Sequence, residues 1–234
     1  MKILGLQKVT LIDYPGKIAC TFFLFGCNFR CGFCHNPSLV FPSKDSVEIS
    51  KQEALDYLKS KKNYLDGVCF TGGEPLLSME DDFLKEIKNL GYLIKIDTNG
   101  SFPEKLQKLI DKGFVDFVAM DIKNSKEKYF ESTRVKVDLK KIEKSIKAIL
   151  KLEDYEFRTT IVNNLHEKED IEKIGKWVNE LSGKKPRKYV LQGFKKQGEI
   201  LDESFKKIPD TKESTLKEMK EIAEKYFEEV EIRV

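Results

Sequence analysis

Short apolar runs alternate with amphipathic stretches along most of the chain. The segments 18–25, 68–70 and 93–96 are apolar and rich in β-branched or aromatic residues, which predicts buried strands. Between the first two of them, Ser50 and Glu53 have the spacing of a capping box and mark the start of a helix. The chain therefore alternates strands with helices from its first third onward.

This alternation continues to residue 191, with further strands expected over 115–120, 157–162 and 189–191. The further expected helices cover residues 81–90, 103–112, 139–152 and about 168–181, with Gly91 and Gly113 as C-terminal caps. Six strand–helix units predict a parallel sheet but are too few for a closed eight-stranded barrel. The expected fold is α/β, a partial and laterally open (β/α)6 barrel with its chemistry at the C-terminal ends of the strands.

We expect one domain over residues 1–234, with its core at about 16–195. The polar segment 194–215 is expected to be rich in loops and is the long candidate lid. A helix at about 216–227 and a strand at 230–234 are expected within a C-terminal part, about 212–234, that packs on the core.

Charge and hydropathy narrow the class of protein. The chain has 42 Lys and Arg against 39 Asp and Glu, a formal net charge of +3, which does not indicate a dedicated nucleic-acid binder. Most charges are expected on solvated helix faces. No apolar run reaches the roughly 18 residues of a membrane span, and the N-terminal residues lack the layout of a signal peptide. These features predict a cytoplasmic protein without membrane partners.

The chain has five cysteines, of which Cys27, Cys31 and Cys34 fall within eight residues. An odd number with such crowding is a poor disulfide framework and indicates metal or redox chemistry in a reducing compartment. Cys20 and Cys69 lie in apolar runs, where we expect them to be buried as small hydrophobic residues.

Three thiolates in one loop, with no fourth cysteine nearby, would leave one iron of an iron–sulfur cluster with an open coordination site. Zinc is the alternative, with His35 as the fourth ligand. His35 directly follows Cys34, so closing a tetrahedron with both would be strained. The spacing therefore favours iron–sulfur over zinc, and a closed electron-transfer or structural metal module is the non-catalytic alternative.

The stretch GCNFRCGFCHN resembles the CxxxCxΦC motif of the radical S-adenosylmethionine (SAM) superfamily, with Phe33 as the aromatic residue Φ. Together with TGGEP, DTNG and DIK it is similar to the short activating enzymes of glycyl-radical enzymes, above all the anaerobic ribonucleoside-triphosphate reductase activating proteins. The similarity extends over roughly residues 5–195. The alternative is a radical SAM enzyme acting on a small molecule, such as 7-carboxy-7-deazaguanine synthase, but the segment 12–16 resembles the activating enzymes more.

The resemblance implies an oxidoreductase with one [4Fe–4S] cluster that cleaves SAM reductively to a 5′-deoxyadenosyl radical. That radical would abstract a glycine Cα hydrogen from a partner glycyl-radical enzyme under anaerobic conditions. The electron would come from a donor such as flavodoxin or ferredoxin. No side chain of the chain is then expected as a catalytic base.

The resemblance also assigns roles to residues. Cys27, Cys31 and Cys34 would hold the cluster, and Asp97 and Asp121 would hold a monovalent cation, Na⁺ or K⁺, near the SAM carboxylate. The residues implied to bind cofactor are Phe33, Cys34, His35, Gly72, Gly73, Glu74, Asp97, Asp121, Lys123, Arg158 and Gln192.

Some of these residues have a structural alternative. The Gly72–Gly73 pair on its own is typical of a tight turn. Arg158 lies in a strand-like run, where a charge needs a polar cleft or an ion pair, so it either reaches SAM or forms a structural pair. Some relatives have a histidine in place of Gln192. Outside the motifs, His166 is expected at the surface and Trp177 in the core.

Overall fold

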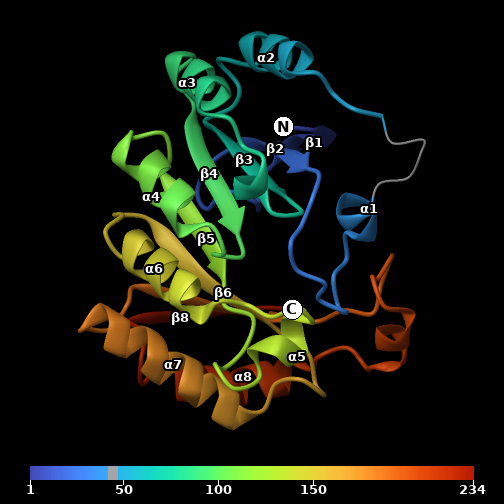
Figure 1. Ribbon diagram of the computed structural model, residues 1–234, viewed down its shortest axis with the longest axis vertical. Coiled ribbons are helices and arrows are strands. Elements are labelled where there is room, and N and C mark those ends of the chain that lie inside the picture. Colours follow the sequence, from blue (N-terminus) through green and yellow to red (C-terminus); the bar gives the residue numbers. More distant parts are fainter. Residues whose placement is uncertain (42–46) are drawn as a thin grey trace. The chain divides into compact units, whose positions relative to one another are not determined.

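The computed structural model describes residues 1–41 and 47–234, and Figure 1 shows the elements along the chain. The strands are β1 (Ile3–Thr10), β2 (Ala19–Leu24), β3 (Gly67–Gly72), β4 (Leu93–Thr98), β5 (Phe117–Asp121), β6 (Tyr155–Ile161), β7 (Lys188–Gly193) and β8 (Glu229–Arg233). The α-helices are α1 (Pro37–Val40), α2 (Lys51–Ser60), α3 (Asp81–Asn89), α4 (Pro103–Asp111), α5 (Tyr129–Thr133), α6 (Leu139–Ile149), α7 (Lys168–Ser182) and α8 (Glu213–Ala223). Two 3₁₀ turns are η1 (Pro75–Leu77) and η2 (Glu203–Lys207).

The strands are hydrogen-bonded in chain order, from β1 at one end to β8 at the other, so the sheet is open. β1 is antiparallel to β2, whereas β2, β3 and β4 are parallel, as are β6, β7 and β8. Alternation of parallel strands with helices is the α/β architecture that the sequence predicted. The prediction of an open, partial (β/α)6 barrel is confirmed.

The chain forms two compact units. Unit 1 comprises Met1–Asn28, Ser38–Thr98 and Glu104–Val118. Unit 2 comprises Phe29–Pro37, Asn99–Pro103 and Ala119–Val234. The single domain over residues 1–234 stays a prediction.

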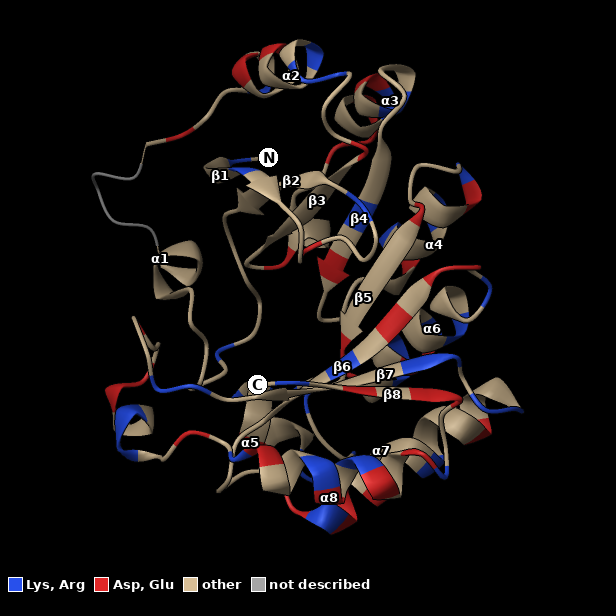
Figure 2. Cartoon of the chain, turned by 180° about the vertical axis from the view of Figure 1, so that it is seen from behind, with Lys and Arg blue, Asp and Glu red and all other residues tan. Residues whose placement is uncertain are grey.

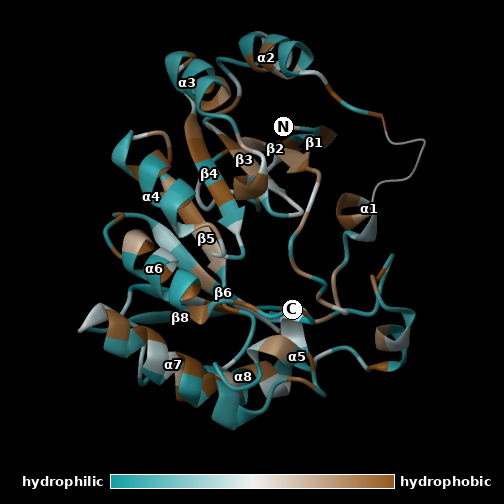
Figure 3. Ribbon diagram, in the orientation of Figure 1, coloured by the Kyte–Doolittle hydropathy of each residue, from teal (hydrophilic) through white to brown (hydrophobic). Residues whose placement is uncertain are grey.

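In unit 1, α2 and α3 pack together, and Phe83 of α3 lies against Phe70 of β3 with ring centroids 6.2 Å apart. The capping box of Ser50 and Glu53 is present, and it starts α2 at the expected residue. Phe22 and Phe70 stack with ring centroids 5.7 Å apart in this core. Figure 3 shows β4 in the hydrophobic colour at its start and in teal at its arrowhead, while α2 and α3 carry a hydrophilic face.

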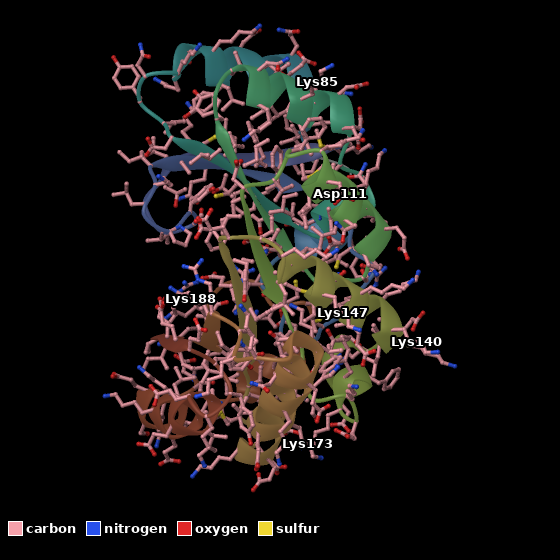
Figure 4. The ribbon with its side chains drawn as sticks, turned by 90° about the vertical axis from the view of Figure 1, so that its left-hand side faces the viewer. Lys85, Asp111, Lys140, Lys147, Lys173 and Lys188 are labelled. Carbon is pink, nitrogen blue, oxygen red and sulfur yellow. The ribbon has the colours of Figure 1, made fainter. Side chains whose placement is uncertain are left out.

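In unit 2, α7 and α8 pack together, and Tyr189 of β7 stacks on Phe227 with centroids 4.5 Å apart. Trp177 of α7 is buried, as expected, and its indole N–H donates to Glu143 at 3.0 Å. Figure 2 shows basic and acidic residues interspersed along α7 and α8. In Figure 4 the labelled charged side chains Lys140 and Lys147 of α6 point away from the ribbon, as solvated helix faces require.

The structure contains elements that the sequence patterns did not predict, namely β1, α1 and α5. In β1 the middle residues are half-buried or exposed, so the apolar signal of a buried strand is missing. No helix in the described part of the chain is long and apolar enough to cross a membrane.

Candidate active site

The start of the cysteine loop packs on the Gly72–Gly73 turn, backbone against backbone. The amide of Gly73 donates to the carbonyl of Leu24 at 2.9 Å, and that of Glu74 donates to the carbonyl of Gly26 at 2.7 Å. Gly72 has φ +116°, and a Cβ on Gly73 would lie 2.0 Å from the Gly26 oxygen. Gly73 is therefore required by close packing on Gly26, the residue before Cys27, and Gly72 by its positive φ and by the Leu24 backbone 2.6 Å from the position of a Cβ.

Gly73→Ala is expected to displace this packing and to lower cluster loading. The backbone of Gly26 cannot yield as a side chain would, so we expect a loss of about 1–3 kcal/mol of stability and less iron in the reconstituted protein. Iron and sulfide content and the melting temperature measure the effect. Gly5→Ala is the matched control, because a Cβ there meets only the Phe23 side chain at 3.3 Å. Equal iron content and melting temperature in the two variants would contradict the packing argument.

Glu74 follows the glycines and is fully buried. Its Oε1 accepts from the Thr98 hydroxyl at 2.8 Å and from the Leu76 amide at 3.0 Å, which caps η1. This carboxylate therefore links the turn after β3 to the end of β4. A direct contact of Glu74 with cofactor stays a prediction.

Asp97 near the end of β4 is half-buried beside the fully buried Lys95. The Lys95 ammonium donates to Asp97 Oδ1, and the Thr71 hydroxyl lies 3.3 Å from Oδ2. Within unit 1 the carboxylate is therefore held by an ammonium and by a hydroxyl of the neighbouring strand.

In unit 2 the residues Cys31 to Cys34 form a turn, with the Cys34 amide donating to the Cys31 carbonyl at 3.0 Å. Cys31 is buried and Cys34 is half-buried. The amides of Leu201 and Asp202 donate to the carbonyls of Cys34 and Gly32 at 2.9 and 3.0 Å. These bonds tie a distant segment of the chain to the cysteine loop.

Aromatic side chains continue this bracing. Phe33 packs on Phe205 with centroids 6.2 Å apart, and the exposed His35 stacks on Phe194 at 5.6 Å. Arg134 has its guanidinium 5.2 Å from the centre of the Phe205 ring. The segment 194–205 thus fixes the loop of Cys31 and Cys34, although the sequence suggested only a lid or a partner contact for it.

Arg134 also forms an ion pair with Asp202 at 2.6 Å. Its φ of 55° places it in the left-handed region at the end of α5. A Cβ on Gly32 would lie 2.4 Å from the Phe205 ring and 2.8 Å from the Arg134 guanidinium. Only glycine therefore fits between Cys31 and Phe33 without moving this brace.

Asp121 at the end of β5 forms a charge cluster with two basic residues. Lys123 Nζ lies 2.8 Å from Asp121 Oδ2, and Arg158 Nε donates to Oδ1 at 2.9 Å. Burial would raise the pKa of the Asp121 carboxyl, but Arg158 and Lys123 lower it well below its usual range. The carboxylate therefore stays ionised down to strongly acidic pH. The structural ion pair is one of the two roles expected for Arg158, and its reach to SAM stays a prediction.

His166 is buried, so the expectation of a surface histidine is wrong. Its Nδ1 accepts from the Val162 amide at 3.1 Å, and its Nε2 lies 2.9 Å from the Lys123 carbonyl. Burial lowers the pKa of the imidazole, which favours the neutral form with the proton on Nε2. His166 thus holds the backbone of Lys123 beside the charge cluster. The charged sequence around His166 gave no sign of its burial, and its contact with Lys123 joins residues 43 positions apart.

Gln192 on β7 is half-buried and lies in register with Thr160 of β6 and Arg233 of β8. Arg233 forms two bonds with the buried Glu156 at 3.0 and 2.8 Å. The sequence patterns gave no signal for this pair. A contact of Gln192 with a nucleoside stays a prediction.

The donor set fits an iron–sulfur cluster by its chemistry, since three thiols in one braced loop are the ligands that such clusters take. Among residues 1–41 and 47–234, no three His, Cys, Asp or Glu side chains are arranged so that they could hold a metal ion. The cluster assignment is therefore carried by the spacing of the cysteines and by the family of the chain.

The family is identified by a match to a family model. The model of the radical SAM superfamily matches residues 21–181. The chain belongs to the radical SAM superfamily. Membership implies a [4Fe–4S] cluster and SAM as cofactors.

Relatives place this radical SAM enzyme among the activating enzymes of glycyl-radical enzymes. A Methanocaldococcus jannaschii protein with the provisional name glycyl-radical enzyme activating enzyme MJ1227 is 34% identical over 98% of this chain and 94% of its own length. The pyruvate formate-lyase-activating enzyme of Clostridium pasteurianum is 35% identical over 53% of this chain and 52% of its own.

A solved structure agrees on the fold. The structure of a domain of pyruvate-formate lyase-activating enzyme from Bacteroides vulgatus matches with a TM-score of 0.57 and 20% identity. It covers 72% of this chain and 99% of that one.

Proposed function

We propose that this radical SAM enzyme produces a 5′-deoxyadenosyl radical and uses it to abstract a glycine Cα hydrogen from a partner glycyl-radical enzyme. The observation that carries the proposal is the near full-length similarity to a relative named as an activating enzyme of this kind. The similarity extends over the cysteine loop and also over the segment 194–205 that braces it.

Cys27, Cys31 and Cys34 would hold the cluster. When bound, the cluster and SAM supply a one-electron cleavage of the sulfonium S–C5′ bond, which yields methionine and the 5′-deoxyadenosyl radical. The chain's own residues then need only to bind, orient and exclude water. SAM would be bound by residues Phe33, Cys34, His35, Gly72, Gly73, Glu74, Asp97, Asp121, Lys123, Arg158 and Gln192.

The charge cluster of unit 2 supports this assignment. Lys123 and Arg158 each form an ion pair with Asp121, and Arg158 also lies 3.9 Å from the buried carboxylate of Glu156. Their side chains are only 15% and 12% exposed, so these charges lie at a poorly solvated place. An anion such as the methionyl carboxylate of SAM would be attracted to the two basic side chains through charge-assisted hydrogen bonds.

The proposed partner is anaerobic ribonucleoside-triphosphate reductase, which the TGGEP, DTNG and DIK motifs favour by resemblance. The proposed electron donor is a flavodoxin or a ferredoxin, and the proposed location is the cytoplasm. Na⁺ or K⁺ at Asp97 and Asp121 is implied by the resemblance alone and is not part of the proposed function.

The activation assay is expected to give a glycyl radical on the partner. Reconstituted enzyme, dithionite, SAM and the co-encoded glycyl-radical enzyme are mixed without oxygen and frozen for electron paramagnetic resonance. We expect a doublet signal from the partner and its absence with the Cys31→Ala variant. SAM cleavage that leaves every co-encoded glycyl-radical enzyme without a signal would refute the activating role.

A further inference from the structure

Lys95 lies inside the parallel strands of unit 1. Register pairs place Thr21 of β2 beside Cys69 of β3, and Cys69 beside Lys95 of β4. These three residues therefore lie in one row across one face of the sheet. Figure 2 shows both charge colours on β4, whereas the neighbouring β3 carries no charged residue.

Lys95 has a side chain only 2% exposed, which is unusual for an ammonium group. Its Nζ donates to Asp97 Oδ1 and lies 5.8 Å from the centre of the Phe117 ring. Lys95 and Asp97 are two residues apart on a strand, so their side chains extend from the same face. A charge at such a place is tolerated only with a close partner, and Asp97 is that partner.

The Lys95–Asp97 ion pair conflicts with the free cation expected at Asp97. The resemblance implies Na⁺ or K⁺ there to relieve the negative charge of the aspartates. In unit 1, however, Asp97 Oδ1 already bonds the Lys95 ammonium, and Thr71 is placed to donate to Oδ2. A free cation at this carboxylate would have to share it with the buried ammonium, and two like charges so close in a poorly solvated place repel.

We propose that Lys95 is a tethered cation that replaces free Na⁺ or K⁺ at Asp97 and positions this carboxylate for the SAM site. The proposal rests on the proposed function, because it assigns Asp97 to that site. In unit 2 the same logic holds for Asp121, whose two oxygens bond Lys123 and Arg158. Lys95 acts through Asp97 and is a positioning residue.

The wild-type protein tests the proposal first. SAM affinity by calorimetry and melting temperature are measured on the anaerobically reconstituted protein in NaCl, KCl and tetramethylammonium chloride at one ionic strength. Tetramethylammonium is too large to sit on a buried carboxylate. We expect the same affinity and melting temperature in all three salts. A dependence on Na⁺ or K⁺ in the wild type would overturn the proposal.

Lys95→Met then removes the ammonium but keeps most of the side-chain volume. In tetramethylammonium this variant is expected to lose about tenfold or more in SAM affinity, as for loss of one charge-assisted bond. Na⁺ or K⁺ should restore part of the affinity and raise the melting temperature, because a small cation can then occupy the vacated place. Unchanged SAM affinity in Lys95→Met would also overturn the proposal.

Two further variants keep the result interpretable. Lys88→Met breaks a half-buried pair with Asp116 at 2.8 Å in the same unit, and its stability should not depend on which cation is present. Lys95→Met/Asp97→Asn should fold if the single variant does not, since no uncompensated carboxylate remains. Its SAM affinity should be indifferent to the cation. A response to Na⁺ in the double variant would contradict the assignment to Asp97.

The proposed function and this inference fail separately. If the wild-type protein cleaves SAM and activates its partner but requires K⁺, the proposed function stands and the proposed role of Lys95 is refuted. If the protein binds SAM without cation dependence but produces no glycyl radical, the proposed function is refuted and the role of Lys95 stands.

Discussion

Replacing Cys27, Cys31 or Cys34 with Ala is expected to reduce cluster-dependent SAM cleavage to background, whereas Cys20→Ala and Cys69→Ala retain it. Three thiolates ligate three irons of the cluster and leave the fourth iron open. The loss of any one of these cysteines removes a ligand that no other cysteine replaces. Cys20 is fully buried and burial raises the pKa of its thiol to about 12, which disfavours the thiolate that a ligand must be.

Burial also raises the pKa of Cys69, the second control cysteine. Iron and sulfide per chain, together with 5′-deoxyadenosine formed with dithionite, measure the effect. A motif variant that keeps both its iron and its 5′-deoxyadenosine production would contradict the ligand assignment, as would loss of activity in Cys69→Ala.

Asp121→Ala is expected to cost about 3 kcal/mol of stability, the lower end of the range for removing one partner from a buried charge pair, because the Asp121 side chain is 26% exposed. Lys123 and Arg158 would both lose this carboxylate as an ion-pair partner. SAM affinity should fall as well, because the two cations lose their fixed position. Chemical denaturation measures the first effect and calorimetry with SAM the second.

Asp111→Ala is the matched control for this variant. Asp111 is exposed on α4 and accepts from Gln107 four residues away at 2.6 Å, so its loss should cost less than about 0.5 kcal/mol. Figure 4 shows its labelled side chain on the outside of the helix. If the two variants were equally stable, the charge cluster around Asp121 would have no structural role.

The sequence predicted most of the elements because their signals are local. The capping residues Ser50 and Glu53 and the cap Gly113, at φ +65°, are where the patterns placed them. Apolar runs at β2 and β3 are long enough to identify buried strands without knowing their neighbours. β1 was missed because half-buried edge strands lack such runs.

The site was predicted less completely, because its support comes from contacts distant in sequence. His166 reaches Lys123 across 43 positions, and Asp202 reaches Gly32 from another part of the chain. The sequence does contain a signal for Lys95, because this lysine lies inside an apolar strand and two residues before an aspartate. Its partner could have been inferred from the alternation of strand side chains, but its burial could not.

The most direct test of the proposed function is to follow the glycine Cα hydrogen into 5′-deoxyadenosine by isotope labelling. The partner glycyl-radical enzyme is produced with glycine deuterated at Cα and is activated by the reconstituted enzyme with unlabelled SAM. We predict that mass spectrometry finds one deuterium in the 5′-deoxyadenosine formed and that the doublet in electron paramagnetic resonance collapses. 5′-Deoxyadenosine without deuterium, alongside stoichiometric conversion of a small molecule, would contradict the account.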